Sequence, residues 1–434
     1  MRSLPLILIF ALILMPIKVL AEGAVIVVID SLGSSYISPD TATYTGGTPI
    51  SPLELKFVDR ADARYQLQVP VPATEYGHAV IVTGYSGADQ EMVAYYNATI
   101  FDALKGAGYV ALGVLENGDS KQMLGKLDAV VREKKDSIYT PAFEFFQKGT
   151  KVPPDVVKLM KDYPGLKPVK AGKDKYGPYI RYNNWSLDFT TALVKYISLN
   201  EPGLDYILLV NAGGLDHSGH STGYNGYKTV LSGLEPEMER LIDTCGASGT
   251  VLIVTGDHGM SFSEDNSRGS HAGEEASSRN ESLLTPLLIY SNKTLKGGGG
   301  TYGQECLAPT VLSLLDEPDT MSLSDGEPLP VKEKPTLFLR SKSQKNVSIT
   351  GDNYSTTASV NGIYRLGGLE KGDYVVSYDG GQIKVHITHD ELIDILEENK
   401  QSSPALPVWV IYLIIAIVTI IGIIAALRLA WMRK

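Results

Sequence analysis

The sequence has 434 residues, of which 44% are hydrophobic, and a formal net charge of −10 from 39 basic and 49 acidic residues. This length and apolar content are sufficient for two or three domains with large buried cores. The acidic balance argues against a nucleic acid as a stable partner, because such proteins normally present a basic face. Two cysteines exclude a disulfide-dense scaffold and a Cys-rich zinc module.

The N-terminus begins with a targeting pattern. Arg2 precedes an apolar run, and a small residue, Ala21, stands at a suitable cleavage point. This pattern predicts a signal peptide over residues 1–21, with a short uncleaved anchor as the alternative.

Apolar runs alternate with helical stretches over residues 22–320. The runs at 24–30, 109–115, 205–211, 249–257 and 286–290 predict buried strands, and the stretches at 100–108, 187–199, 226–244 and 306–315 predict helices. This alternation predicts an α/β catalytic domain with a mostly parallel sheet flanked by helices. Ligands of such sheets bind beyond the carboxyl ends of the strands.

The next segments differ in composition. Residues 116–183 are rich in Lys, Asp, Pro and Tyr and have weak periodicity, which predicts a cap or insertion over the sheet that sets substrate choice. Prolines and charges over residues 321–335 predict a linker. Short alternating runs over residues 336–389 predict a small antiparallel β-sandwich, and the stretch 360–374 resembles carboxypeptidase-regulatory-like β domains.

The C-terminal part carries membrane signals. Residues 389–400 predict an acidic helix within a juxtamembrane stalk over residues 390–405. Residues 408–427 contain no charge and are long enough to cross a bilayer, whereas a long core helix is the alternative. Basic residues at 428, 433 and 434 place the tail, residues 428–434, in the cytoplasm. We therefore expect a single-pass cell-membrane protein with its catalytic domain outside the cytoplasm.

Two further features fit export. Six asparagines lie in Asn-X-Ser/Thr sequons and are candidate glycosylation sites: Asn97, Asn184, Asn280, Asn292, Asn346 and Asn353. Cys245 and Cys306 either form a disulfide in an oxidising compartment or remain two buried thiols.

Chemistry-bearing residues follow the ends of the predicted strands. Asp30 ends the first strand, Asp257-His258 ends another, and Asp216 and His220 follow a third at a spacing of four. His271 lies in a loop rich in glycine and serine. Carboxylate and imidazole ligands without thiolates suit Zn²⁺, Mn²⁺ or Fe²⁺. Because clustered carboxylates repel one another, we expect two divalent metal ions here.

A further motif, Thr74-Glu-Tyr-Gly-His78, opens an apolar stretch that ends at Gly84. It predicts a short helix with Thr74 at its N-terminus, where amide donors favour an anion. Thr74 is then either an ordinary N-cap or a nucleophile activated by a bound metal.

These motifs, in this order, resemble the alkaline phosphatase superfamily. Thr74–His78 resembles the Ser-Glu-Val-Gly-His motif of cofactor-independent phosphoglycerate mutases, and a threonine with Thr-Gly at 83–84 is similar to nucleotide pyrophosphatase/phosphodiesterases. The stretches 256–260, 269–273 and 281–286 resemble glycolipid-anchor ethanolamine phosphate transferases. The sulfatase signature, Cys or Ser followed by X-Pro-X-Arg, is absent at residue 74.

The resemblance implies roles for individual residues. One metal ion, zinc or manganese, is expected on Asp216, His220 and His271, and a second on Asp30, Asp257, His258 and the Thr74 oxygen. Thr74 is expected to form a phosphothreonine intermediate. His78 and His217 match no ligand position, and we expect them to contact ligands instead.

The resulting hypothesis is a membrane-anchored extracytoplasmic phosphohydrolase, either a phosphatase or a phosphodiesterase, that acts on a phosphoester. A phosphoethanolamine-type transferase and a mutase-like enzyme remain alternatives. The non-enzymatic alternative is a catalytically silent surface scaffold, which the retention of every ligand type in order argues against.

Overall fold

The computed structural model describes residues 22–39, 44–45, 48–119, 121–135, 137–170, 174–264 and 267–395. The predicted signal peptide, membrane-spanning segment and cytoplasmic tail lie outside these ranges. Within them, no helix combines the length and the apolar character needed to cross a membrane. The described residues divide into two compact units: the first holds those from 22 to 338 with 365–373 and 386–393, and the second holds 339–364, 374–385 and 394–395.

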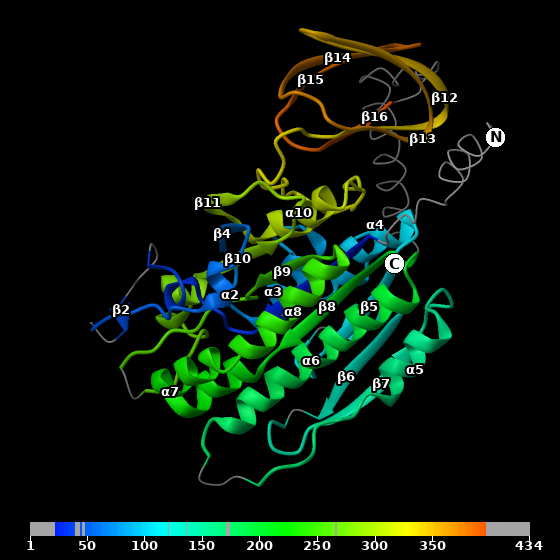
Figure 1. Cartoon of the computed structure of the whole chain (residues 1–434). Helices are drawn as coiled ribbons and strands as arrows, with labels where there is room; N and C mark the ends of the chain where they lie inside the picture. Colours follow the sequence, from blue (N-terminus) through cyan, green and yellow to red (C-terminus); the bar gives the residue numbers. More distant parts are fainter. Residues whose placement is uncertain are drawn as a thin grey trace, which may run out of the picture. The chain divides into compact units, whose positions relative to one another are not determined.

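The first unit is built on a nine-stranded sheet with the order β11-β4-β10-β9-β1-β8-β5-β6-β7 (Figure 1). Strands β10 and β7 run against their neighbours, and the other strands share one direction. The strands are β1 Gly23–Ile29, β4 Ala63–Gln68, β5 Val110–Leu115, β6 Ala129–Lys135, β7 Ala142–Gln147, β8 Tyr206–Ala212, β9 Val251–Thr255, β10 Leu284–Tyr290 and β11 Gly297–Gly303. The predicted mixed α/β fold with a mostly parallel sheet is confirmed.

The continuous apolar runs are explained by burial on both faces of the sheet. In β1, Val25, Val27 and Ile29 belong to one hydrophobic core. The intervening residues of the same strand, Ala24 and Ile26 among them, belong to the other. Because side chains alternate along a strand, a strand covered on both sides needs apolar residues at every position.

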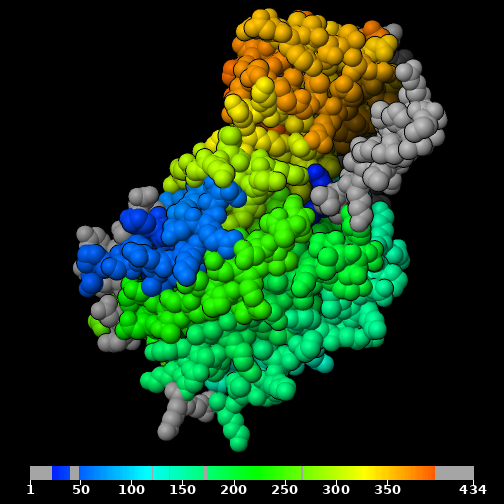
Figure 2. All heavy atoms as spheres, viewed as in Figure 1, coloured from blue at the N-terminus to red at the C-terminus, as the bar shows by residue number. Residues whose placement is uncertain are grey.

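Helices cover the two faces. Helices α2, α5, α6, α7 and α8 contribute to the first core and α3, α4 and α10 to the second. Figure 1 shows α6 and α8 in front of the sheet, and their green surface hides it in the space-filling view (Figure 2). The helices are α2 Lys56–Asp59, α3 Thr74–Thr83, α4 Ile100–Ala107, α5 Pro154–Asp162, α6 Gly177–Asn200, α7 Gly214–Ser232, α8 Glu235–Ser248, α9 Asn280–Leu283 and α10 Leu307–Leu314.

Short elements complete this unit. Two-residue strands β2 (Tyr44–Thr45) and β3 (Thr48–Pro49) pair with each other. The 3-10 turns are η1 Ser34–Tyr36, η3 Met92–Ala94, η4 Lys121–Gly125, η5 Ala276–Ser278 and η6 Gln304–Cys306. The stretch predicted as one helix over 226–244 is divided between α7 and α8, because Pro236 lies in the first turn of a new helix.

The segment 116–183 extends the sheet, where a cap over it was expected. It supplies the last two strands of the sheet, β6 and the edge strand β7, and then α5 and the start of α6. The strand signal was missed because only the first five residues of β6 are buried and the run is short and ends in charged residues. The predicted linker 321–335 contains no helix or strand, but it is packed onto the first unit through the buried Leu329 and Val331.

The C-terminal strands form one five-stranded sheet, where a two-sheet sandwich was expected. They are β12 Leu337–Gly351, β13 Tyr354–Leu366, β14 Gly372–Tyr378, β15 Gly381–Ile387 and β16 Glu391–Asp394. The long β12 pairs with β13, with β14 and with β16, so all five strands are connected through it. The predicted acidic helix is wrong over 391–394, because pairing as β16 buries Ile393.

Cys245 and Cys306 are free thiols in the structure, so the disulfide alternative is not realised. Cys245 lies in α8 within the apolar core, and burial raises its pKa.

Candidate metal centre

The acidic residues expected at the strand ends converge. Asp30 follows β1, Asp257 follows β9, and Asp216 lies in the first turn of α7 after β8. Because β9, β1 and β8 are parallel neighbours, their carboxyl ends open at the same edge of the sheet. This convergence forms two groups of potential metal ligands. Asp30, Asp257 and His258 form one group, and Asp216, His258 and His271 form the other. Within each group the ligand atoms all lie within 4.8 Å of one another.

Glycines allow the segments to approach so closely. A side chain at Gly77 of α3 would stand 2.8 Å from the carbonyl carbon of Asp257. A side chain at Gly256 would stand 2.6 Å from the carbonyl oxygen of Leu32. These distances are well below van der Waals contact, so the backbone around Asp257 packs directly against two other segments. The glycines in the two motifs therefore have a steric role.

The three clustered histidines share one orientation. The Nδ1 atoms of His220, His258 and His271 lie 2.8–2.9 Å from the carbonyl oxygens of Gly269, Gly259 and Pro72. A carbonyl only accepts, so each Nδ1 donates its proton, and Nε2 is the ring nitrogen that faces the site. Metal-binding histidines are commonly fixed in this way by a carbonyl behind the ring.

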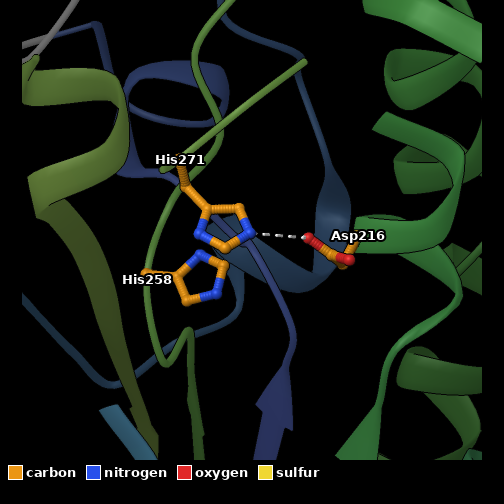
Figure 3. A group of neighbouring side chains, drawn as sticks. All are labelled: Asp216, His258 and His271. Atoms are coloured by element: carbon orange, nitrogen blue, oxygen red, sulfur yellow. Dashed lines mark ion pairs between the residues drawn. The ribbon is translucent and has the colours of Figure 1, made fainter. Parts of the chain in front are cut away.

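Each of these Nε2 atoms faces a carboxylate. His220 Nε2 lies 3.3 Å and His271 Nε2 3.7 Å from Asp216 Oδ1. His258 Nε2 lies 3.4 Å from Asp257 Oδ2 and 3.6 Å from Asp30 Oδ1. Figure 3 shows His258 and His271 stacked, with their ring centroids 3.9 Å apart and with Asp216 opposite. Imidazole nitrogens and carboxylate oxygens that converge at these distances are ligand atoms that a divalent metal such as Zn²⁺ or Mn²⁺ takes.

The electrostatics point the same way. Burial, followed by the charges of Asp257 and Asp216, raises the pKa of Asp30 well above its ordinary value. Burial alone would raise the pKa of Asp216, but the hydrogen bond with His220 and the charges of the neighbouring histidines lower this pKa overall. Asp30 Oδ1 and Asp257 Oδ2 are buried without a hydrogen-bond partner among the described residues. The residues present therefore fit the two divalent cations that the sequence predicts.

Thr74 lies where this cluster meets α3. The N-cap of α3 is Ala73, which makes no side-chain capping bond, so the alternative of Thr74 as N-cap is wrong. The Thr74 hydroxyl instead lies 3.2 Å from His258 Nε2. The helix ends as predicted at Gly84, whose φ of +63° suits glycine.

Sequence analysis missed Ser31, which joins the two groups of ligands. Its hydroxyl donates to Asp216 Oδ1 at 2.6 Å, and its backbone N–H donates to Asp257 Oδ1 at 3.0 Å. Its φ of +66° is rare for a residue with a side chain, and Tyr227 holds the carbonyl of Ser31 by a 2.7 Å hydrogen bond. Strained backbone of this kind clusters at functional sites. The only signal in the sequence is its place directly after Asp30.

The remaining predicted residues have different surroundings. His78 is fully buried below Thr74, close to Asp119 and Asp257. His217 is half-buried on α7 beside Asp216 and belongs to neither ligand group. Four sequon asparagines are exposed: Asn280, Asn292, Asn346 and Asn353. The other two, Asn97 and Asn184, are half-buried, and their amide N–H groups donate to carbonyl oxygens.

Comparison with known proteins places this site in context. No family model matches the chain. The cofactor-independent (2,3-bisphosphoglycerate-independent) phosphoglycerate mutase of Haloquadratum walsbyi is 28% identical over 144 residues, which cover 32% of this chain and 26% of that protein. The corresponding enzyme of Prochlorococcus marinus is 27% identical over 162 residues, which cover 35% and 28%. The chain thus matches about a quarter of the length of these relatives.

Solved structures with similar folds include the alkaline phosphatase PafA, with a TM-score of 0.47 and 13% identity over 70% of this chain and 97% of that one. The lipoteichoic acid synthase LtaP of Listeria monocytogenes has a TM-score of 0.47 and 10% identity over 78% and 84%. A 2-O glycosaminoglycan sulfatase has a TM-score of 0.44 and 9% identity over 84% of both chains.

These relatives and neighbours belong to the alkaline phosphatase superfamily of phosphoester hydrolases, sulfatases and mutases. The resemblance predicted from the motifs is confirmed at this level.

Proposed function

We propose that the chain is a phosphoester hydrolase that uses Thr74 as nucleophile and two divalent cations. One observation carries the proposal: two histidines and three aspartates form two groups of converging ligand atoms beside the hydroxyl of Thr74. The similarity to mutases and phosphatases supports the same class of chemistry.

The position of Thr74 at the start of α3 suits phosphoryl transfer. The first N–H groups of a helix have no intrahelical acceptor, and the helix dipole favours an anion there. The phosphoryl oxygens of a substrate would accept from these N–H groups while Thr74 faces the phosphorus. When bound by the two ligand groups, divalent cations would supply positive charge for the attacking oxygen and for the phosphoryl oxygens.

The reaction then proceeds in two displacements. The Thr74 oxygen forms a bond to phosphorus as its proton passes to solvent, and the bond to the leaving alcohol breaks, the alcohol taking a proton from water. Water then attacks the phosphothreonine, restoring the hydroxyl and releasing the phosphate group. If an acceptor alcohol replaces water in the second step, the same intermediate gives a transferase or a mutase, and the names of the curated relatives favour keeping this second candidate.

The test uses the full-length chain, stripped of metal by a chelator and reloaded with Zn²⁺ or Mn²⁺. Initial rates are measured with a chromogenic phosphate monoester and a chromogenic diester, with and without glycerol as acceptor, for wild type, Thr74→Ala and Thr74→Ser. We expect metal-dependent turnover that Thr74→Ala lowers by at least about 10³-fold. Acid quenching should trap a phosphoryl group on the peptide that contains Thr74. Binding of no cation, together with no turnover of either ester, would instead support a silent scaffold.

We further propose that this activity faces the outside of the cell, with the chain anchored by residues 408–427. Support comes from the sequence of the two ends and from the exposure of four sequon asparagines. Protease added to intact cells should digest the catalytic unit while leaving a tag fused after Lys434 protected. Protection of the catalytic unit would contradict this topology.

A further inference from the structure

A buried polar pair lies directly behind the candidate site. His78 occupies α3 one turn after Thr74, and its side chain is 1% exposed. Its Nδ1 lies 3.1 Å from Asp119 Oδ1, and its Nε2 lies 3.9 Å from Asp257 Oδ2. The side chains of both carboxylates are fully buried, so the imidazole ring stands between two acids that water does not reach. Asp119 was not among the residues found from the sequence.

Asp119 is fixed from two directions. Its Oδ1 accepts a 2.7 Å hydrogen bond from the amide of Asn211 in β8. Its Oδ2 accepts a 2.7 Å hydrogen bond from the backbone N–H of Glu116, directly after β5. Because β5 and β8 are adjacent strands of the sheet, the carboxylate has one orientation, and its Oδ1 lies within ion-pair distance of His78 Nδ1.

His78 links this anchor to two residues of the candidate site. Residues four apart on a helix lie on the same face, so His78 and Thr74 are stacked along one side of α3. The helix also touches the backbone of Asp257 at Gly77. A displacement of the His78 ring would therefore move both the hydroxyl of Thr74 and the carboxylate of Asp257.

We propose that His78 and Asp119 are positioning residues. They fix the position of α3 relative to the Asp257 carboxylate, and so keep the Thr74 hydroxyl beside the candidate ligand group of Asp30, Asp257 and His258. This inference rests on the proposed function. Neither residue touches the reacting atoms. Loss of partners that orient metal ligands typically costs about 10- to 100-fold in metal affinity or activity.

Two substitutions separate the two contacts of the ring. The amide nitrogen of an asparagine takes the place of Nδ1, so His78→Asn keeps the contact to Asp119 and loses the one to Asp257. The amide of a glutamine reaches the place of Nε2, so His78→Gln keeps the contact to Asp257. Asp119→Asn removes the charge of the anchor. Thr83→Val is the matched control, since Thr83 is a fully buried residue at the other end of α3. Its hydroxyl donates to the carbonyl of Ala79 and accepts from the N–H of Tyr85, both close in sequence.

The full-length chain of each variant is titrated with Zn²⁺ and Mn²⁺ in competition with a chromogenic chelator. Unfolding temperature in excess chelator, kcat and KM are measured alongside. We expect His78→Asn and Asp119→Asn to weaken one of the two cation sites by about 10- to 100-fold and to lower kcat with KM unchanged. His78→Gln should retain more affinity than His78→Asn. Thr83→Val should lower the unfolding temperature and leave both cation affinities at the wild-type values.

The opposite result is equally clear. If His78→Asn and Asp119→Asn lower the unfolding temperature as Thr83→Val does, yet bind both cations with wild-type affinity, the pair is structural and the inference is overturned. If wild type itself binds no cation, the proposed function fails first, which the wild-type titration distinguishes.

Discussion

Gly77 offers a sharp test of how α3 and the metal ligands are joined. A methyl group at this position would stand 2.8 Å from the carbonyl carbon of Asp257 and closer still to its oxygen. Ordinary contact requires about 3.5 Å, so Gly77→Ala must move α3 away from Asp257 by up to about 1 Å. A misplacement of about 1 Å at a reacting group can cost about 10²-fold in rate. We therefore expect kcat/KM of Gly77→Ala to fall by about 100-fold.

The effect on stability should be small by comparison. Overpacking costs about 1–3 kcal/mol, whereas alanine gains about 1 kcal/mol over glycine inside a helix. The net loss in the free energy of unfolding should thus be at most about 2 kcal/mol, measured by urea denaturation. Gly106→Ala is the matched control, since its new side chain on the exposed face of α4 would meet nothing within 4 Å. That variant should be slightly stabilised with full activity. Full activity of Gly77→Ala with both metals bound would refute the reasoning.

Three further predictions follow from the same structure. Ser31→Ala removes the hydroxyl that donates to Asp216 at 2.6 Å, and calorimetric titration should show cation affinity lowered by about tenfold. Burial raises the pKa of Glu317 from 4.5 to about 7, so the native state holds this proton more tightly and stability is lost as pH rises through that window. Glu317→Gln should remove about 1 kcal/mol of the difference between unfolding free energies at about pH 5 and about pH 8, after allowance for solvent screening. In a secretory host, peptide mass spectrometry should find glycans on the exposed sequons and none on the two whose amide nitrogens are bonded: the exposed sites are Asn280, Asn292, Asn346 and Asn353, and the bonded ones are Asn97 and Asn184.

The central part of the fold was predictable because burial on both faces leaves a strong local signal. Strands β1, β8 and β9 are wholly buried and mostly apolar, and the acids that follow them stand out against these runs. Strands β6 and β7 carry no such signal, since β6 ends in charged residues and no residue of the edge strand β7 is fully buried. The pairing of β12 with strands on different sides depends on contacts distant in sequence, which alternation alone does not reveal.

The candidate ligands were recognisable from the sequence, whereas the groups that hold them in place were not. His220, His258 and His271 were found because histidine is rare in this chain and each belongs to a motif that follows a strand. Their partners behind the ring are the carbonyls of Gly269, Gly259 and Pro72, and any residue can supply a carbonyl. The local sequence therefore identifies what binds, whereas the fold determines how it is held.

Ser31 and Asp119 show why this distinction matters for the chemistry. Both are ordinary polar residues at the ends of strands, yet one bridges the two ligand groups and the other anchors the ring below Thr74. Burial, followed by the charges of Asp257 and Asp216, raises the pKa of Asp30, so a small displacement would let this carboxylate take a proton in place of a cation. Rigid supports on neighbouring strands keep the carboxylates convergent against this repulsion. If the proposal is right, the affinity of this site for divalent cations depends on residues that do not touch the cation.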